Sequence, residues 1–326
     1  MNNKRKICFR ADAGPEIGYG HFIRSLALAD MLKRDFNCKM FTQTPTDYQI
    51  REAINICPIV ALPNDDSKFS LFLEQLSGDE IVVLDNYFFT TDYQRAIKDK
   101  GCKLVCLDGM VTKHYVSDVL LNQSLDLQRK DFSLEPYTQL LLGLNYVLLR
   151  KPFYSIGGHN YNRNKDKRSV VIGFGGSDPY NLLQEYVPLL NNLPEVGRIV
   201  VIAPNHDLNF SADKIEIKTH IQAEELVHIY TNVDFGILPS STMLKEAIAC
   251  HLPVISGYFV DNQIFAYESY KRNKLIHGIG DFRTNEAKQQ LLSCIQGGYQ
   301  FETIDFGNSG ITPDIPSKYI EIFKTL

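Results

Sequence analysis

The chain has 326 residues, of which 44% are hydrophobic and 22% are charged, and its formal net charge at pH 7 is −4. These values are ordinary for a globular protein and exclude a disordered chain, and the length suggests two domains. The acidic balance provides no overall basic field for nucleic acid or acidic membranes, and no apolar stretch reaches the roughly 18 residues of a membrane span.

The N-terminus and the cysteines predict a cytoplasmic protein. Only Ile7-Cys8-Phe9 follows the first basic residues, which is too short for the apolar region of a signal peptide. The seven cysteines are scattered and odd in number, as expected in a reducing compartment. Cys102 and Cys106 are interpreted as small buried hydrophobes. No His-x-x-His or Cys-x-x-Cys spacing indicates a zinc site, so no metal is expected.

In the N-terminal half, apolar runs alternate with helical patterns. A strand is expected at residues 7–9, a glycine-bearing loop at 14–20, and a helix from 21 to about 34. Further strands are expected at 81–84, 103–107 and 119–121, with a helix over 91–100. Such runs predict a parallel sheet covered on both faces, with ligands bound at the carboxyl ends of its strands. Asp85 and Asp108 lie at such ends, either as ligand-facing acids or as turn and capping residues.

A polar, glycine-bearing segment at residues 155–167 is expected to link this half to a second α/β series. Strands are expected there at 169–174, 199–202, 215–218, 235–238, 253–255 and near 275. Helices are expected near 180 and at 223–230, 243–250, 261–271, 286–295 and 317–326. The predicted fold class is therefore α/β, with Rossmann-like domains at 1–154 and 168–326.

The loop before the first predicted helix carries a candidate base. In Gly18-Tyr19-Gly20-His21, the glycines allow a sharp turn and close approach to a ligand. His21 falls in the first helical turn, where the positive helix end disfavours imidazolium and keeps a neutral base. Arg24 follows three residues later on the same face. The alternative is a helix-capping histidine without chemistry.

Two loops in the second half are candidate phosphate sites. The first, Gly175-Gly176-Ser177-Asp178, offers backbone amides and a hydroxyl at a helix N-terminus. It lacks the Walker lysine and the Gly-x-Gly-x-x-Gly spacing. The alternative interpretation is a tight turn in which Asp178 caps the following helix. The second is Ser240-Ser241-Thr242, with Glu246 one turn later to accept ribose hydroxyls. Its alternative is a capping serine with a solvated glutamate.

Segments spread over residues 5–280 form a more specific pattern. They are residues 10–12, 18–24, 84–87, 121–125, 141–150 and 174–179, then Ser241-Thr242 with Glu246, and residues 261–263. In this order they resemble the UDP-2,4-diacetamido-2,4,6-trideoxy-β-L-altropyranose hydrolases of pseudaminic acid biosynthesis and their spore-coat polysaccharide relatives. That family is similar to the N-acetylglucosaminyltransferase of peptidoglycan synthesis.

The resemblance implies the glycosyltransferase-B fold, with two doubly wound domains facing across a cleft. It implies metal-independent, inverting hydrolysis of a UDP-activated diacetamido-trideoxy sugar in nonulosonic acid biosynthesis, without a cofactor. His21 would be the general base that deprotonates water. The other candidate residues are Asp12, Tyr87 and Asn262 in the catalytic pocket, Gly175, Gly176, Ser177, Ser241, Thr242 and Glu246 for UDP, and Gly20, Arg24, Asp85 and Gln263 for the sugar.

The chain departs from these relatives at several places, including the neighbours of the retained Gln123, and other functions stay open. Pro239-Ser240 replaces a Gly-Gly, so one backbone donor is lost, and Gly109 follows Asp108 where relatives often carry a second Asp. The alternatives are an inverting glycosyltransferase of the same fold and an inactive nucleotide-sugar binding protein. A dehydrogenase is disfavoured because the dinucleotide fingerprint is absent. A UDP-sugar is the expected partner, and a monomer is expected.

Overall fold

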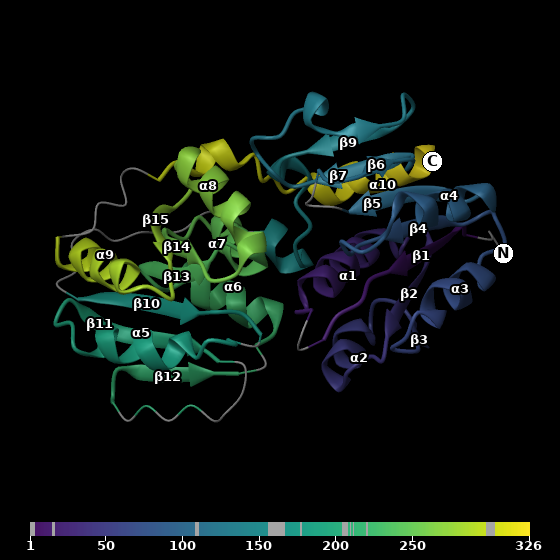
Figure 1. Cartoon of the computed structure of the whole chain (residues 1–326). Helices are drawn as coiled ribbons and strands as arrows, with labels where there is room; N and C mark the ends of the chain where they lie inside the picture. Colours follow the sequence, from purple (N-terminus) through teal and green to yellow (C-terminus); the bar gives the residue numbers. More distant parts are fainter. Residues whose placement is uncertain are drawn as a thin grey trace. The chain divides into compact units, whose positions relative to one another are not determined.

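The computed structural model describes residues 4–14, 17–107, 111–155, 167–176, 178–203, 208, 210, 212–219, 221–297 and 304–326. The chain divides into two compact units, Met1–Lys151 with Ile311–Leu326 and Pro152–Gly310 (Figure 1). Below they are called unit 1 and unit 2. The predicted linker, residues 155–167, lies almost entirely outside the described residues.

Unit 1 is built on a seven-stranded parallel sheet in the order β3-β2-β1-β4-β5-β7-β9. Its strands are β1 Lys6–Arg10, β2 Asn37–Gln43, β3 Ile59–Leu62, β4 Ile81–Leu84, β5 Lys103–Leu107, β7 Val119–Asn122 and β9 Gln139–Leu142. A small second sheet pairs β6 His114–Tyr115 with β8 Ser133–Leu134. The helices are α1 Gly20–Leu32, α2 Asp47–Ala53, α3 Ser67–Glu74, α4 Thr91–Asp99 and α10 Ile315–Thr325, with short 3-10 turns at η1 Arg129–Asp131, η2 Leu144–Tyr146 and η3 Lys151–Tyr154, the last running into unit 2.

Helices cover the unit 1 sheet from both sides. From β1 the chain moves to β2 on one side, and from β4 it moves to β5 on the other. Because parallel crossovers are right-handed, α1 and α4 lie on opposite faces. Phe72 of α3 and Ile97 of α4 join one buried apolar cluster with Cys8, Val82 and other strand residues. This is the two-sided parallel sheet that the apolar runs predict.

The C-terminal helix α10 packs in unit 1, although the predicted division placed residues 317–326 in the second domain. Its buried face contains Ile315, Tyr319 and Phe323. The ring of Phe323 lies 6.3 Å from that of Phe36, which follows α1 in the sequence. Tyr319 Oη donates a hydrogen bond to the carbonyl oxygen of Tyr146 at 2.5 Å. The apolar stripe of α10 is therefore buried against the N-terminal half of the chain.

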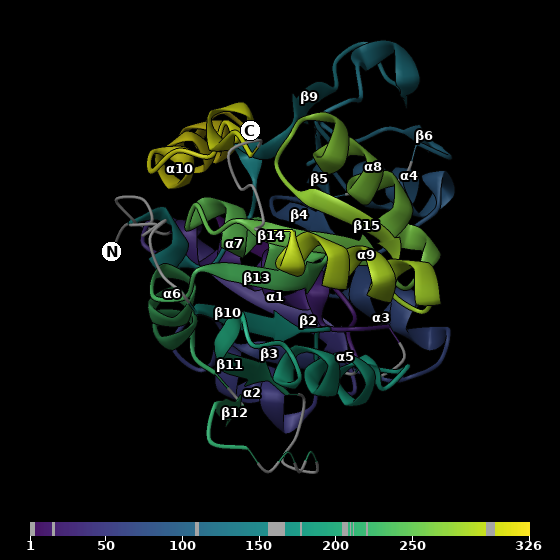
Figure 2. The same ribbon diagram turned by 90° about the vertical axis from the view of Figure 1, so that its left-hand side faces the viewer.

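Unit 2 contains a six-stranded parallel sheet in the order β12-β11-β10-β13-β14-β15. Its strands are β10 Arg168–Gly173, β11 Val196–Ile202, β12 Ile215–Lys218, β13 Phe235–Pro239, β14 Val254–Tyr258 and β15 His277–Asp281. Its helices are α5 Leu182–Asn191, α6 Ala223–Thr231, α7 Thr242–Ala249, α8 Ile264–Arg272 and α9 Asn285–Gln296, with 3-10 turns at η4 Asp261–Gln263 and η6 Phe306–Ser309. Side chains of α5 and α9 share one core with β10 and β11, and Figure 2 shows both helices in front of the sheet.

The predicted α/β class with two parallel sheets is confirmed. Most predicted elements lie within a few residues of those observed, but residues 37–80 carried no assignment and contain β2, α2, β3 and α3. Cys102 and Cys106 are buried, as predicted. Burial also raises the pKa of the Cys8 and Cys38 thiols to about 12, so neither is a thiolate at neutral pH.

Candidate active site

In each unit the strand order reverses at one point, and the loops singled out in the sequence follow the strands that flank it. In unit 1 these strands are β1 and β4, which are neighbours in the sheet. In unit 2 they are β10 and β13. Ligands of open α/β sheets bind outside the carboxyl ends of the strands at such points. Each unit therefore has a candidate site where sequence and topology agree.

His21 lies in the first turn of α1, as predicted. The loop before the helix is closed by two backbone hydrogen bonds between Gly14 and Gly18. Gly18 has a φ of 80°, a left-handed conformation that a glycine adopts without strain. Tyr19, the N-cap residue, makes no side-chain hydrogen bond to the first turn. His21 therefore lies where the loop after β1 enters α1, and it is not the residue that caps the helix.

The partner of His21 is Asp85, directly after β4. The imidazole Nδ1 lies 2.7 Å from Asp85 Oδ1. Arg24 Nη2, which only donates, lies farther from Nδ1, at 3.1 Å. The nearer carboxylate only accepts hydrogen bonds, so we assign the proton to Nδ1. This tautomer leaves the lone pair on Nε2, the nitrogen that a general base uses. The arrangement matches the general pattern of a base oriented by a third group.

Asp85 is fully buried and accepts hydrogen bonds from four donor atoms of three residues. Besides His21, it accepts hydrogen bonds from Arg24 Nε at 2.6 Å, from Arg24 Nη2 and from Ser25 Oγ at 3.0 Å. Burial would raise the pKa of Asp85, yet Arg24 and His21 bring that pKa below its usual value. Asp85 is thus ionised at neutral pH and supports His21. In the structure Asp85 and Arg24 pair with each other, and their assignment to the sugar stays a prediction.

Tyr87 forms a wall beside His21. Its ring meets the imidazole edge-on, with centroids 4.7 Å apart, and the residue is 37% exposed. Lys113 Nζ donates to the carbonyl oxygens of Tyr87 and Phe89 at 2.8 and 3.0 Å, which fixes the backbone of this loop. Gly20, expected near the sugar, is exposed at the start of α1. Tyr87 and Gly20 therefore both lie next to His21.

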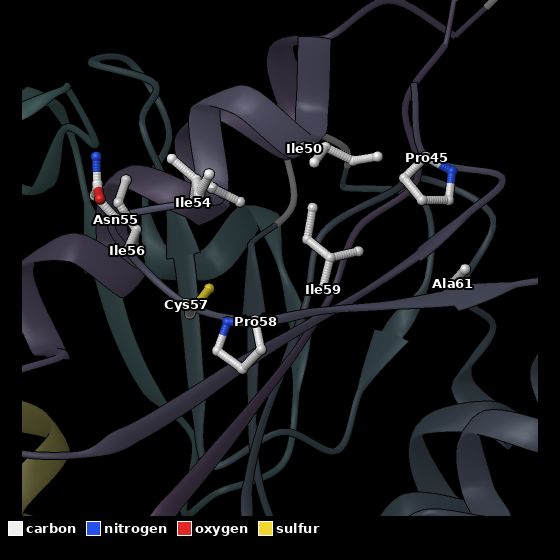
Figure 3. Close-up of a pocket in the computed structure, with 10 residues that line it drawn as sticks. Pro45, Ile50, Ile54, Asn55, Ile56, Cys57, Pro58, Ile59 and Ala61 are labelled. Carbon is white, nitrogen blue, oxygen red and sulfur yellow. The ribbon is translucent and has the colours of Figure 1, made fainter. Parts of the chain in front are cut away.

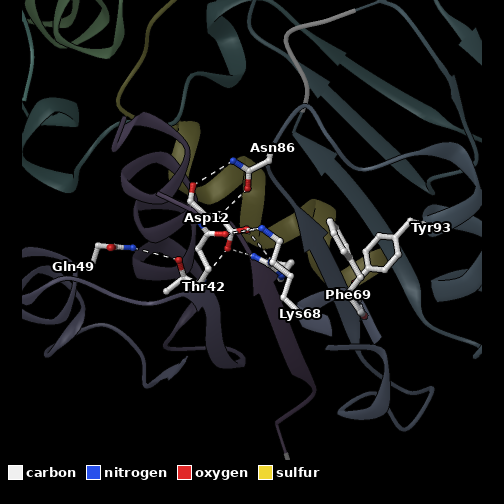
Figure 4. A network of polar contacts seen from close by, with 9 residues as sticks. Asp12, Thr42, Gln49, Lys68, Phe69, Asn86 and Tyr93 are labelled. Atoms are coloured by element: carbon white, nitrogen blue, oxygen red, sulfur yellow. Dashed lines mark hydrogen bonds and ion pairs between the residues drawn. The ribbon is translucent and has the colours of Figure 1, made fainter. Parts of the chain in front are cut away.

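The carboxylate of Asp12, which the resemblance places in the catalytic pocket, pairs with residues other than His21. Asp12 is fully buried, and its carboxylate accepts hydrogen bonds from the Arg10 guanidinium and from the Gln43 amide at 2.8 Å (Figure 4). Burial tends to raise the pKa of Asp12, but the hydrogen bonds and charge of Arg10 bring it below the usual value. Asn86 pairs with the Asp12 backbone through its Oδ1 and Nδ2 atoms, at 2.7 and 3.2 Å. Asp12 is therefore a buried residue whose hydrogen bonds connect the segment after β1 with the segment after β4.

In unit 2, the loop after β10 is a turn with a built-in cap. Asp178 accepts hydrogen bonds from the Leu182 and Leu183 amides at 2.9 and 3.0 Å, so its carboxylate binds the first amides of α5. Gly175 has a φ of 88° and no atom within 4 Å of the place of a Cβ. Gly176 is exposed. Ser177, the predicted phosphate ligand between them and Asp178, lies outside the described residues, as do Asp108 and Gly109.

The loop after β13 leads directly into α7. Ser240 is buried, and its amide is bonded to the Gly257 carbonyl oxygen at 2.9 Å. Ser241 and Thr242 are half-buried at the start of α7. Ser241 makes no side-chain capping bond, and Glu246 is only 2% exposed. The alternative of a capping serine with a solvated glutamate is therefore wrong. A buried carboxylate one turn into the helix remains a candidate for a ribose hydroxyl.

Two predicted residues lie after β14, on η4. Asn262 is exposed. Gln263 is mostly buried, and its Oε1 accepts a hydrogen bond from the Phe259 amide at 3.1 Å. Gln263 therefore stabilises the backbone after β14, and its assignment to the sugar stays a prediction.

A pocket of about 710 Å³ lies elsewhere in unit 1, beside α2 and β3. Its lining is mostly aliphatic, including Ile50, Ile54 and Ile59 (Figure 3), and contains neither His21 nor Asp85. Within the described ranges, no group of three His, Cys, Asp or Glu side chains is placed to hold a metal ion. None of the helices in the described part of the chain is long and apolar enough to cross a membrane.

No protein-family model matches this chain. Three proteins of similar sequence align with most of its length. An uncharacterized protein of Methanocaldococcus jannaschii is 26% identical over 81% of this chain and 58% of its own length, so the chain spans little more than half of that protein. The UDP-2,4-diacetamido-2,4,6-trideoxy-β-L-altropyranose hydrolase of Campylobacter jejuni is 24% identical over 79% of this chain and 93% of its own. The spore coat polysaccharide biosynthesis protein SpsG of Bacillus subtilis is 21% identical over 89% and 88%.

Solved structures decide the fold. Arabidopsis thaliana UGT89C1 in complex with UDP-L-rhamnose gives a TM-score of 0.67 at 10% identity, over 99% of both chains. Acinetobacter baumannii MurG gives 0.61 at 13% identity, over 98% of this chain and all of its own. The chain has the GT-B fold. At such low identities, the likeness to glycosyltransferases establishes this GT-B architecture and leaves the reaction open.

Proposed function

We propose that this GT-B protein hydrolyses a UDP-activated 2,4-diacetamido-2,4,6-trideoxy sugar to the free sugar and UDP, in a pathway to a nonulosonic acid. The observation that carries the proposal is the His21–Asp85 pair at the point where the unit 1 strand order reverses. The sequence similarity to the Campylobacter hydrolase supports the substrate class.

His21 is proposed as the general base. Its Nε2 takes a proton from a water molecule as the water oxygen attacks the anomeric carbon. The bond from that carbon to the UDP oxygen breaks with its electron pair, and UDP leaves from the opposite face, so the anomeric configuration inverts. Asp85 stabilises the imidazolium that forms, since the carboxylate lies 2.7 Å from Nδ1.

The loops after β10 and β13 are proposed to bind UDP. Gly175, Gly176, Ser177, Ser241 and Thr242 are assigned to the diphosphate, and Glu246 to the ribose. Backbone amides and helix N-termini stabilise a diphosphate leaving group by directed donors. The reaction is therefore proposed to need neither a metal nor a cofactor.

The test is to incubate the purified protein with UDP-2,4-diacetamido-2,4,6-trideoxy-β-L-altrose in the presence of EDTA and to follow UDP release by NMR. In ¹⁸O-labelled water, attack at the anomeric carbon places the label in the sugar and none in UDP. His21→Ala is expected to lower turnover by ~10²–10⁴, the usual contribution of a general base, with UDP affinity nearly unchanged. An unchanged rate in His21→Ala removes His21 from the mechanism.

A second candidate is an inverting glycosyltransferase, which the GT-B neighbours favour. Such an enzyme uses the same base on an acceptor hydroxyl in place of water. UDP release that depends on an added acceptor, with the sugar recovered on that acceptor, would identify transfer. Binding of UDP without any turnover would instead indicate an inactive nucleotide-sugar binding protein.

A further inference from the structure

Lys68, the second residue of α3, reaches over the carboxyl ends of β1 and β2. Its Nζ atom donates to Gln43 Oε1 at 2.6 Å and lies 3.1 Å from Asp12 Oδ2 (Figure 4). The side chains of Arg10 and Asp12 are completely buried, whereas that of Lys68 is 13% exposed. Lys68 is thus the member of this cluster that solvent, or a ligand, can reach.

The cluster carries more positive than negative charge. Arg10 and Lys68 are both cations, and both pair with the single carboxylate of Asp12, so the three side chains together carry a net charge of +1. The charge of Lys68 also acts on Asp65, but Asp65 is exposed and its Oδ1 accepts hydrogen bonds from Ser67. A poorly compensated charge near the interior is costly, which favours an electron-rich ligand group at the exposed ammonium.

The ammonium also has a donor to spare. A lysine Nζ carries three N–H groups, and two of them serve Gln43 and Asp12. In the residues that the structure describes, no acceptor is found for the third. The ligand group at this place therefore needs an acceptor oxygen.

Two aromatic rings lie beside the ammonium group of Lys68. Nζ lies 5.0 Å from the ring centroid of Phe88 and 5.5 Å from that of Phe69. Phe88 is 38% exposed. It follows Tyr87, whose ring contacts His21, so one loop after β4 borders both His21 and Lys68. A group bound at Lys68 thus has an apolar surface on one side and lies at the same sheet edge as the proposed base.

We propose that Lys68 and Phe88 recognise an acylamino substituent of the sugar. The third N–H of Lys68 donates to the acyl carbonyl oxygen, and the Phe88 ring packs against the acyl methyl group. An acylamino group combines a strong acceptor with an apolar end, whereas a hydroxyl or a phosphate lacks the apolar part. The inference deepens the proposed function and rests on it for the identity of the sugar.

The first test compares Lys68→Met with the unchanged protein on UDP-2,4-diacetamido-2,4,6-trideoxy-β-L-altrose. Loss of a charge-assisted hydrogen bond is expected to lower kcat/KM by about 10- to 100-fold, mainly through KM, with the affinity for UDP alone unchanged. Lys68→Met should fold because Arg10 still neutralises Asp12. Lys98→Met is the matched control, since Lys98 also pairs with a partly buried carboxylate, Asp118, before β7, and its kcat/KM should stay within about twofold.

The second test needs no turnover. Saturation-transfer difference NMR on the bound UDP-sugar should show strong contact at an acyl methyl group, lost in Phe88→Ala, a substitution at an exposed position. If the unchanged protein shows this contact but releases no UDP, the hydrolase proposal fails and the Lys68 inference stands. If UDP is released but Lys68→Met retains full kcat/KM, or if no acyl methyl contacts the protein, the Lys68 inference is overturned.

Discussion

Replacing Asp85 by Asn tests whether this carboxylate supports His21. The change keeps the size of the side chain but removes its charge from beside Nδ1, 2.7 Å away. At an effective dielectric of about 20, unit charges about 4 Å apart interact by about 4 kcal/mol. Because the imidazolium forms only as the water is deprotonated, this loss falls on the transition state. The expected decrease in kcat is about 10²- to 10³-fold.

The assay is UDP release at saturating substrate, with UDP affinity measured by calorimetry and folding checked by thermal denaturation. Arg24 loses its counter-charge in Asp85→Asn, so a stability loss of about 2–3 kcal/mol is also expected. Ser25→Ala is the matched control. It removes a single 3.0 Å hydrogen bond to the same carboxylate and leaves the imidazole contact intact, so kcat should change by less than about fivefold. A folded Asp85→Asn variant with a kcat within about fivefold of the parent would refute the reasoning.

Three further predictions concern stability and the nucleotide loop. Burial favours a raised pKa for Glu80, but hydrogen bonds from Ser77 and Gly78 lower it from 4.5 to about 2. Its contribution to folding is therefore complete above about pH 4.5 and declines as the pH falls toward 2. Glu80→Gln should lower the free energy of unfolding by about 1–3 kcal/mol at pH 7 and flatten its acid dependence, as urea titrations at several pH values will show. Phe323→Ala should cost about 3–5 kcal/mol, because this residue is 1% exposed on the buried face of α10; a smaller loss in chemical denaturation would mean that α10 does not stabilise unit 1. Gly175→Ala forces a side chain into a left-handed conformation, which costs about 1–2 kcal/mol. A loop that relaxes out of this conformation must regain it to bind UDP, so calorimetry should show UDP bound about 5- to 30-fold more weakly; unchanged affinity would mean that this loop does not bind UDP.

Much of the fold could be predicted because its signals are local. The apolar runs of β4, β5, β10 and β13 stand out against polar helices and loops, and glycines precede α1 and α5. The interval 37–80 had no such signal. In β2, Thr42 and Gln43 interrupt the apolar run, yet both are buried, since Thr42 accepts a hydrogen bond from Gln49 and Gln43 binds Lys68. A strand that carries part of a buried polar network does not show the apolar pattern of a core strand.

The same network explains why the sequence did not single out Lys68 or Asn86. A lysine on an amphipathic helix and an asparagine after a strand are ordinary surface residues until their partners are known. Lys68 Nζ meets Asp12 across 56 positions of the chain, and Asn86 meets the Asp12 backbone across 74. Only the neighbouring ends of parallel strands bring these residues together.

The sequence by itself determined the alternating strands and helices, the three loops that begin α1, α5 and α7, and the place of His21 in the first turn of its helix. Those features depend on periodicity and on glycine, which act over a few residues. The tertiary structure decided which acid supports His21. Asp12 is closer in sequence but is engaged by Arg10 and Lys68, whereas Asp85, 64 residues away, lies at the end of the adjacent strand. Strand order, which local sequence does not encode, places that carboxylate beside the imidazole.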